Sequence, residues 1–275
     1  MSHFTVIIDT TNSSVEEQLE PFDENLEVEA HLKDCYCSRH NLNVKVTKEL
    51  EKLFGGSFDK VKREPYNAMD KSVQPDWEEW IADWVGKEEE LKVKFAKYKK
   101  PSKSCTDCNG TGKYETTYNQ DSKWDWYSIG GRWAGYFIVK KGVEPERGEP
   151  SLLMSDFKYE DLSADIVQKR DIDLEAMLKK QKADLDKRWE KRDDPFANIS
   201  KKMTKEQYME KEMKKHPLTP FAFIDGNGEW HEKAEMGWWD MTSNDKAQEA
   251  WEAEFTEWFN SLPEDAELTL VDCHI

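Results

Sequence analysis

Apolar and polar residues alternate at both ends of the chain. This pattern predicts a first strand over residues 3–9 and a last strand over residues 268–275. Residues 221–224 and 229–231 form two further strand-like runs. The sequence Asp225-Gly226-Asn227-Gly228 lies between them, and its glycines can adopt the positive φ of a tight turn. The two runs are therefore predicted to form a β-hairpin.

Helical spacing of apolar residues appears between these ends. It predicts helices from about Val15 to Pro21, over 42–54, over 76–99 and over about 244–261. The Gly55-Gly56 pair ends the second helix. In the third helix, Trp77, Trp80 and Trp84 follow one face, and such a row is more typical of a core than of a ligand cage.

The middle of the chain is less regular. Residues 124–128 and 133–139 are predicted strands around Gly130-Gly131. The highly charged segment 158–216 carries a narrow apolar stripe and is predicted to form one long helix, broken near Pro195, and a second helix from about Thr204.

These elements predict an α+β fold: a mainly antiparallel sheet with helices packed on one face. Residues 1–157 and 217–275 together are expected to form one core, with a zinc-knuckle-like insertion at about 100–118. Residues 158–216 are expected to form a charged helical arm or insertion, although a solvated helix lying on the sheet is the alternative.

The charge balance narrows the class of partner. The formal net charge is -17, which disfavours nonspecific binding of nucleic acid because that requires a surplus of Lys and Arg. An acidic surface can also imitate nucleic acid and inhibit a host enzyme. No stretch approaches the roughly 20 apolar residues that span a bilayer, so no membrane partner is expected. Five cysteines, an odd number, fit a reducing compartment, and we expect the cytoplasm.

The sequence Cys105-Thr106-Asp107-Cys108-Asn109-Gly110-Thr111-Gly112 has the form of a zinc knuckle. It resembles one repeat of the cysteine-rich region of DnaJ-type chaperones, over eight residues only. The remaining ligands are predicted to come from Cys35, Cys37 or His40, and the zinc would be structural. The alternative is a surface turn with two reduced thiols.

A second motif spans residues 123–133 and combines aromatic rings, glycines and charges. Rings can stack on a base, glycines allow close approach of a ligand, and Arg132 can hold a phosphate. Packing of the tryptophans in the core is the competing interpretation. The predicted ligand-binding residues of this motif are Lys123, Trp124, Asp125, Tyr127, Arg132 and Trp133.

Further candidates lie near the C-terminus. His231 and Trp239 belong to a second aromatic and polar cluster, and His274 follows Cys273 in the last strand. Neighbouring residues on a strand point to opposite faces, so Cys273 and His274 cannot readily serve one another as nucleophile and base. No familiar catalytic motif is present in the sequence.

Three stretches together resemble a family of uncharacterised proteins of tailed phages and their hosts. They are residues 3–6 with 21–25, residues 122–133 and residues 271–275. The resemblance implies a phage or prophage origin and an accessory role in the infected cytoplasm. It implies no particular activity.

Three functions are compatible with these observations. The leading hypothesis is a phage-type cytoplasmic binding protein, serving counter-defence or host takeover, that holds a nucleotide-like small molecule or a host protein. The alternatives are a hydrolase or transferase acting on nucleotides through His231, Asp240, Cys273 or His274, and an acidic inhibitor of a host nucleic-acid enzyme. Homo-oligomerisation stays open.

Overall fold

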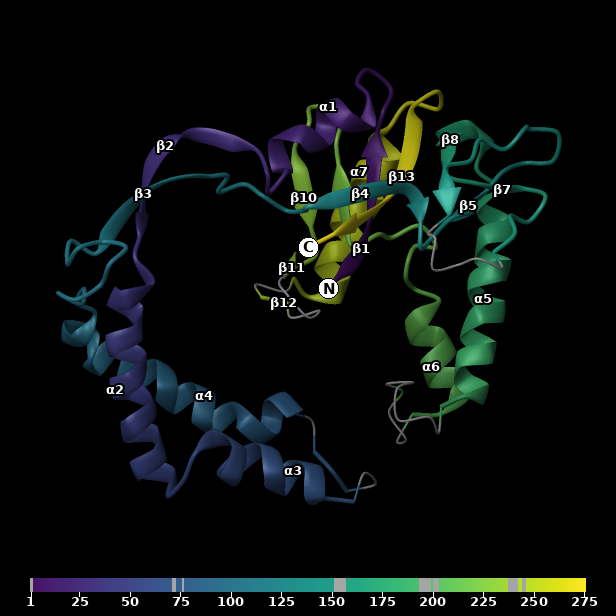
Figure 1. The fold of residues 1–275 in the computed structure, drawn as a ribbon. Coiled ribbons are helices and arrows are strands. Elements are labelled where there is room, and N and C mark those ends of the chain that lie inside the picture. The colour runs from purple at the N-terminus through teal and green to yellow at the C-terminus, as the bar shows by residue number, and fades with distance from the viewer. Residues whose placement is uncertain are drawn as a thin grey trace. The chain divides into compact units, whose positions relative to one another are not determined.

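The computed structural model describes residues 2–70, 73–75, 77–150, 157–192, 199, 203–236, 242–243 and 246–275 (Figure 1). The chain divides into two compact units. One, the sheet unit, comprises residues 1–27 and 118–275, and the other, the cysteine unit, comprises residues 28–117. These boundaries differ from the ones predicted for the core, residues 1–157 with 217–275, and for the helical arm, residues 158–216.

The sheet unit is built on a seven-stranded sheet. Its strand order is β10-β9-β1-β13-β4-β6, and β8 pairs with β13 as well. Four of its pairings are antiparallel, while β1 with β9 and β4 with β6 are parallel. The predicted α+β class with a mainly antiparallel sheet is confirmed. The strands are β1 (His3–Asp9), β4 (Trp126–Gly131), β6 (Glu149–Pro150), β8 (Ile166–Gln168), β9 (Ala222–Ile224), β10 (Trp230–Glu232) and β13 (Glu267–His274).

Alternation along β1 and β13 gives the sheet two apolar faces. Phe4, Val6 and Ile8 point to one face, where Leu19 of the short helix α1 (Val15–Leu19) packs on them. Ile7 and Leu270 point to the other face, which α7 (Gln248–Ser261) covers with Trp251, Phe255 and Phe259. The predicted terminal strands, the hairpin and both helices are therefore present, but α1 and α7 cover opposite faces of the sheet, where one covered face was predicted.

The segment 158–216 differs from its prediction as one long helix. Its first part contains β7 (Ser163–Ala164), β8 and a 3-10 turn (Lys169–Asp171), and only then α5 (Leu174–Glu190) begins. The edge of β13 is available for pairing with residues 166–168, and this long-range pairing overrides the local helical spacing. Met177 of α5 joins the main core. The predicted second helix is α6 (Lys205–Glu212), which Thr204 caps, whereas the break near Pro195 lies outside the described residues.

The cysteine unit consists of a two-stranded ribbon and helices. The ribbon pairs β2 (Glu27–Asp34) with β3 (Lys113–Tyr118), and α2 (Tyr36–Phe54) packs against α4 (Trp77–Lys94). Gly55 ends α2 in the left-handed conformation, as predicted. Of the three tryptophans in α4, Trp84 is buried, while Trp77 and Trp80 are half-buried against Tyr66.

Short elements complete the fold. They are η1 (Glu20–Phe22), η2 (Asp59–Arg63), α3 (Glu64–Ala68), η3 (Ala96–Tyr98), β5 (Phe137–Ile138), β11 (Glu235–Met236) and β12 (Thr242–Ser243). Within the described ranges, none of the helices combines the length and the apolar character that crossing a bilayer requires.

Candidate functional site

Four cysteines of the cysteine unit lie close together. Cys35 and Cys37 stand at the start of α2, and Cys105 and Cys108 belong to the turn that precedes β3. All four sulfur atoms lie within 4.8 Å of one another. Cys35 Sγ is 3.5 Å from Cys105 Sγ, and Cys37 Sγ is 3.5 Å from Cys108 Sγ. A Zn–S bond of about 2.3 Å places the sulfurs of a tetrahedral site about 3.8 Å apart. The four sulfurs therefore fit one zinc ion.

The backbone of the knuckle explains its shape. Asn109, Gly110 and Gly112 have positive φ values of 49°, 81° and 83°, which turn the chain back toward α2. The amide of Cys35 donates to the carbonyl of Gly112 at 2.8 Å, so the two halves of the cluster are held together by backbone as well. A C-x-x-C spacing followed by glycines thus brings both of its sulfurs to one side.

Hydrogen bonds around the sulfurs distribute their charge unevenly. Burial opposes ionisation of Cys108, but the Gly112 and Gly110 amides and the Cys37 and Cys35 thiols outweigh it and lower the Cys108 pKa to about 7. For Cys35, the Cys37 amide favours the thiolate, yet burial and the neighbouring thiols raise its pKa to about 12. A divalent metal bound between the four sulfurs would stabilise several thiolates at once.

His40 is not among the converging ligands in the described part of the chain. It is exposed on α2, where its ring lies against Tyr36. One turn of helix separates it from the cysteines, so Cys35 and Cys37 complete the cluster instead. The fifth cysteine, Cys273, is fully buried in the sheet unit, and burial raises the pKa of its thiol well above the usual value.

The central motif is shaped by two buried aspartates. Gly131 has φ +52°, and a Cβ at this position would lie 2.4 Å from the Cβ of Asp272. A Cβ at Gly130 would similarly lie 2.7 Å from a carboxylate oxygen of Asp165. Both aspartates are fully buried. The glycine pair is thus required by close packing against these carboxylates, and neither partner was found by sequence reasoning.

The predicted ligand-binding residues of this motif do not converge on one pocket. Trp124 is buried, and its indole N–H donates to the Leu19 carbonyl at 3.0 Å. Tyr127 packs edge-on against Trp124, and burial raises its pKa. Lys123 pairs with Glu232 at 2.7 Å. Arg132 is exposed, and its backbone amide donates to Asp272 Oδ2 at 2.9 Å.

Two other predicted residues do meet. His274 Nδ1 lies 2.6 Å from Asp125 Oδ1. The His274 ring stacks on Trp126 with a centroid distance of 5.3 Å, and it contacts the His3 ring edge-on at 4.9 Å. His3 Nδ1 in turn lies 2.8 Å from Asp272 Oδ1. Sequence reasoning missed His3, Trp126 and Asp272, although the antiparallel pairing of the two terminal strands would place the histidines opposite one another.

His231 lies apart from that group. Its ring stacks on Phe223 at 4.5 Å, and its Nδ1 is 3.2 Å from Glu254 Oε1. Asp225, Glu229 and His231 also place their polar atoms within 4.8 Å of one another. Trp239 and Asp240 lie outside the described residues.

A cleft of about 870 Å³ opens in the sheet unit. Thr5 of β1 and residues 133–136 line one side, α5 and the segment from Glu212 to Phe221 line another, and α7 closes it. Five basic side chains line it against three acidic ones. This balance is opposite to that of the whole chain, which has 40 Lys and Arg against 57 Asp and Glu. The basic residues are Lys180, Lys187, Arg188, Lys215 and Lys233.

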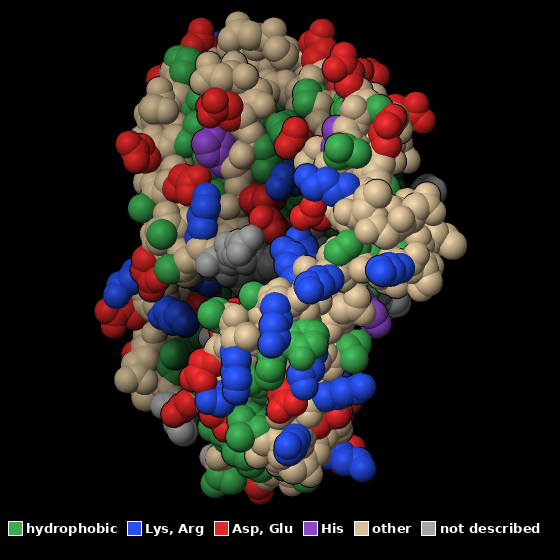
Figure 2. Space-filling model, turned by 90° about the vertical axis from the view of Figure 1, so that its left-hand side faces the viewer, with side chains coloured by type: hydrophobic (Ala, Val, Ile, Leu, Met, Phe, Trp, Pro, Cys, Tyr) green, Lys and Arg blue, Asp and Glu red, His purple; other side chains and the backbone are tan. Residues whose placement is uncertain are grey.

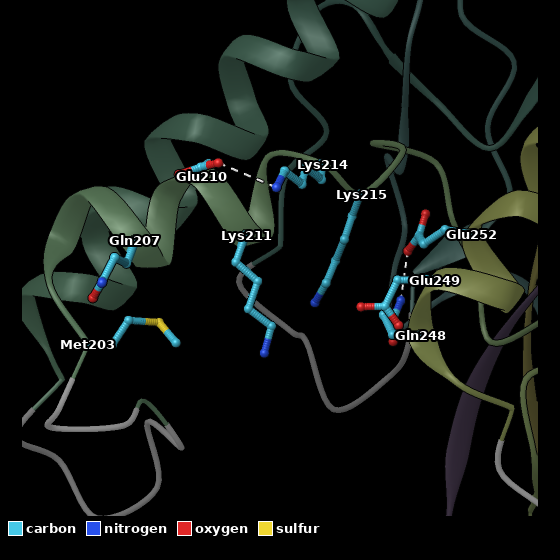
Figure 3. Close-up of a pocket in the computed structure, with 9 residues that line it drawn as sticks. All are labelled: Met203, Gln207, Glu210, Lys211, Lys214, Lys215, Gln248, Glu249 and Glu252. Atoms are coloured by element: carbon cyan, nitrogen blue, oxygen red, sulfur yellow. Dashed lines mark hydrogen bonds and ion pairs between the residues drawn. The ribbon is translucent and has the colours of Figure 1, made fainter.

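A groove of about 700 Å³ adjoins this cleft and shares Lys215, Gln248 and Glu252 with it. Figure 3 shows Lys211 of α6 and Lys215 of the turn after α6 extending into the space toward α7, whereas Lys214 is held by Glu210 at 3.4 Å. The outer surface is mixed in charge: on the face drawn in Figure 2, Lys and Arg side chains are interspersed with Asp and Glu. The cleft lining therefore has an excess of basic side chains, whereas the groove is balanced, with three lysines and three glutamates.

Comparisons with protein-family models, with curated proteins and with solved structures find no match to this chain.

Proposed function

We propose that this protein is a binding protein in which a structural zinc ion organises the cysteine unit and the cleft of the sheet unit holds a nucleotide-like ligand. The zinc part rests on the convergence of four sulfur atoms within 4.8 Å. A site of four cysteines leaves no position open for substrate, so this zinc would be structural.

Metal content tests the zinc part directly. Protein purified without chelator should contain about one zinc per chain by elemental analysis, and Cys105→Ser with Cys108→Ser should remove most of it. Cys273→Ala is the matched control, because this cysteine is buried in the other unit. Absence of zinc after zinc-replete expression, or an unchanged content in the double variant, would overturn this assignment.

The ligand part rests on the lining of the cleft. Trp133, a predicted ligand-binding residue, lines it together with the five basic side chains. Lys187 pairs with Asp184, and Lys215 pairs with Glu212. In the described ranges Lys180, Arg188 and Lys233 have no carboxylate partner. An aromatic ring beside unpaired cations suits a ligand with a base and a phosphate.

Calorimetric titration with AMP, ADP and ATP tests this binding. Replacing Lys180, Arg188 and Lys233 by Ala should weaken binding at least tenfold, because one charge-assisted contact to phosphate is worth about 1.5–3 kcal/mol. Lys179→Ala is the matched control, since this neighbouring lysine pairs with Glu175 and does not line the cleft. Failure of all three nucleotides to bind, or equal affinity of the triple variant, would refute a nucleotide-like ligand.

The setting of this binding is proposed from the sequence motifs. Their resemblance to tailed-phage proteins favours counter-defence or host takeover in the cytoplasm of the infected cell. A host protein is the alternative occupant of the same surface. Co-purification from host cells, analysed for proteins and small molecules, separates the two kinds of partner.

A further inference from the structure

Two histidines from opposite ends of the chain form neighbouring His–Asp pairs. His3 on β1 and His274 on β13 are directly opposite in the antiparallel register. Each Nδ1 lies within hydrogen-bond distance of a carboxylate, Asp272 at 2.8 Å for His3 and Asp125 at 2.6 Å for His274. Each side chain is only 7% exposed. The two imidazoles are therefore fixed in position by packing and by hydrogen bonds.

The carboxylates also fix which nitrogen is reactive. A carboxylate accepts, so Nδ1 of each ring carries the hydrogen and Nε2 is left to exchange a proton. Within the part of the chain that the structure describes, Nε2 of neither ring has a hydrogen-bond partner. A purely structural ion pair would need one carboxylate and one ring, whereas this arrangement holds two rings 4.9 Å apart with both Nε2 atoms unused.

The pair lies beside the cleft. Thr5 lines the cleft and follows His3 by two residues, which places the two side chains on one face about 7 Å apart. Asp272 is opposite Thr5 in the register and accepts the Arg132 amide, and the next residue, Trp133, lines the cleft. The histidines do not themselves line the cleft; they lie on the sheet face of Thr5, two residues along the strand from the end of the cleft that Thr5 lines.

We propose that His3 and His274 act as a general acid–base pair that hydrolyses a phosphate ester in the ligand of the cleft. This inference rests on the proposed nucleotide-like ligand. Nε2 of the neutral imidazole takes a proton from water as the water oxygen bonds to phosphorus. Nε2–H of the protonated imidazole gives its proton to the ester oxygen as the phosphorus–oxygen bond breaks. Proton exchange with solvent then restores both rings, so the step needs no further reactant.

Asp125 and Asp272 are positioning residues in this reaction. They touch the rings and not the reacting atoms, and they orient each imidazole and stabilise its protonated form. Asp125→Asn should therefore lower kcat while leaving KM unchanged. Asp125 is the better choice for a variant, because Asp272 also holds the central motif through the Arg132 amide.

The test uses the purified full chain with two probes, bis(4-nitrophenyl) phosphate and adenosine 2′,3′-cyclic phosphate. Turnover should be detectable, and His3→Asn and His274→Asn should each reduce kcat by about 10²-fold or more. Asn retains an N–H donor for the carboxylate but has no group in place of Nε2, so the fold is preserved, as thermal melting can check. His31→Asn, in the cysteine unit, is the control and should leave turnover unchanged.

The outcomes separate this inference from the proposed function. Nucleotide binding without turnover of either probe, or turnover that survives both Asn variants, would overturn the acid–base pair and leave binding intact. Such a result would mean that the pairs are only structural: His3–Asp272 joins the terminal strands, and His274–Asp125 joins β13 to the segment before β4. Loss of nucleotide binding and of turnover together would overturn both proposals.

Discussion

The sheet unit buries two large hydrophobic clusters, whereas the cysteine unit buries one small cluster. In the described residues, the two clusters of the sheet unit contain sixteen and nine buried side chains. The cluster of the cysteine unit contains four: Val46, Leu50, Trp84 and Leu91. Small units with little core need an additional staple. A zinc ion held by the four cysteines, as proposed above, would supply such a staple in the cysteine unit, whereas the sheet unit has two larger clusters.

Metal removal should cause the largest loss of stability, and this loss should be limited to the cysteine unit. Structural zinc sites contribute about 10–16 kcal/mol of apparent binding free energy, which is far more than the small cluster can replace. Chelation, or Cys108→Ser, should therefore unfold much of residues 28–117. Amide hydrogen exchange should rise there, while β1 and β13 keep their protection.

Cys273→Ala serves as the control for this comparison. It removes a thiol from the core of the sheet unit and should leave exchange in the cysteine unit unchanged. Equal loss of protection in both units on chelation would show that the two units unfold together.

Truncation of a core side chain in the sheet unit should destabilise that unit and leave the cysteine unit unchanged. Phe255 is fully buried in α7 and contacts Phe223, Trp258 and Phe259. Phe255→Ala should lower the free energy of unfolding by about 3–5 kcal/mol, because it leaves a cavity. Denaturant unfolding measures this loss. The zinc content should not change, and a fall in zinc would contradict the independence of the two units.

A substitution in the closely packed central motif should cause a smaller loss of stability. Gly131→Ala should destabilise the sheet unit by about 1–3 kcal/mol more than Gly142→Ala, since the added methyl must displace Asp272. Gly142 is the matched control, because it also has positive φ, at 96°, but nothing lies within 4 Å of a Cβ placed there. Similar unfolding free energies for the two variants would show that the backbone at Gly131 adjusts freely.

Acid should have the smallest effect on the sheet unit. Burial lowers the pKa of His216 below its usual 6.5, although Glu252 partly offsets this. His216 therefore binds a proton more readily in the unfolded chain than in the folded one. Above about pH 6.5 the residue is neutral in both states and costs no stability, and as the pH falls below that value its protonation favours the unfolded chain. His216→Asn should make the unfolding free energy of the sheet unit less dependent on pH between 7 and 5.5. An unchanged slope would exclude His216 as the cause.

Local sequence patterns were sufficient for elements whose signals lie within a few residues. The terminal strands, the hairpin around Gly228, the end of α2 at Gly55 and the start of α6 at about Thr204 were all predicted in this way. The role of Cys105 and Cys108 as two candidate ligands of one metal site also follows from their local spacing. Each of these features depends on backbone conformation or on neighbouring side chains, which the sequence displays directly.

Tertiary structure decided the features that join distant segments. It selected Cys35 and Cys37 over His40 as neighbours of the knuckle, about 70 residues away, and it turned residues 163–168 from a predicted helix into strands. It also placed Asp272 against Gly131 and brought His3 to His274. Such contacts depend on how strands pair and on which faces they bury. No local spacing encodes which distant segments pair, so the sequence by itself determined the elements with strong local signals and the knuckle. Tertiary structure decided which distant residues meet at the cysteine cluster and at the two His–Asp pairs.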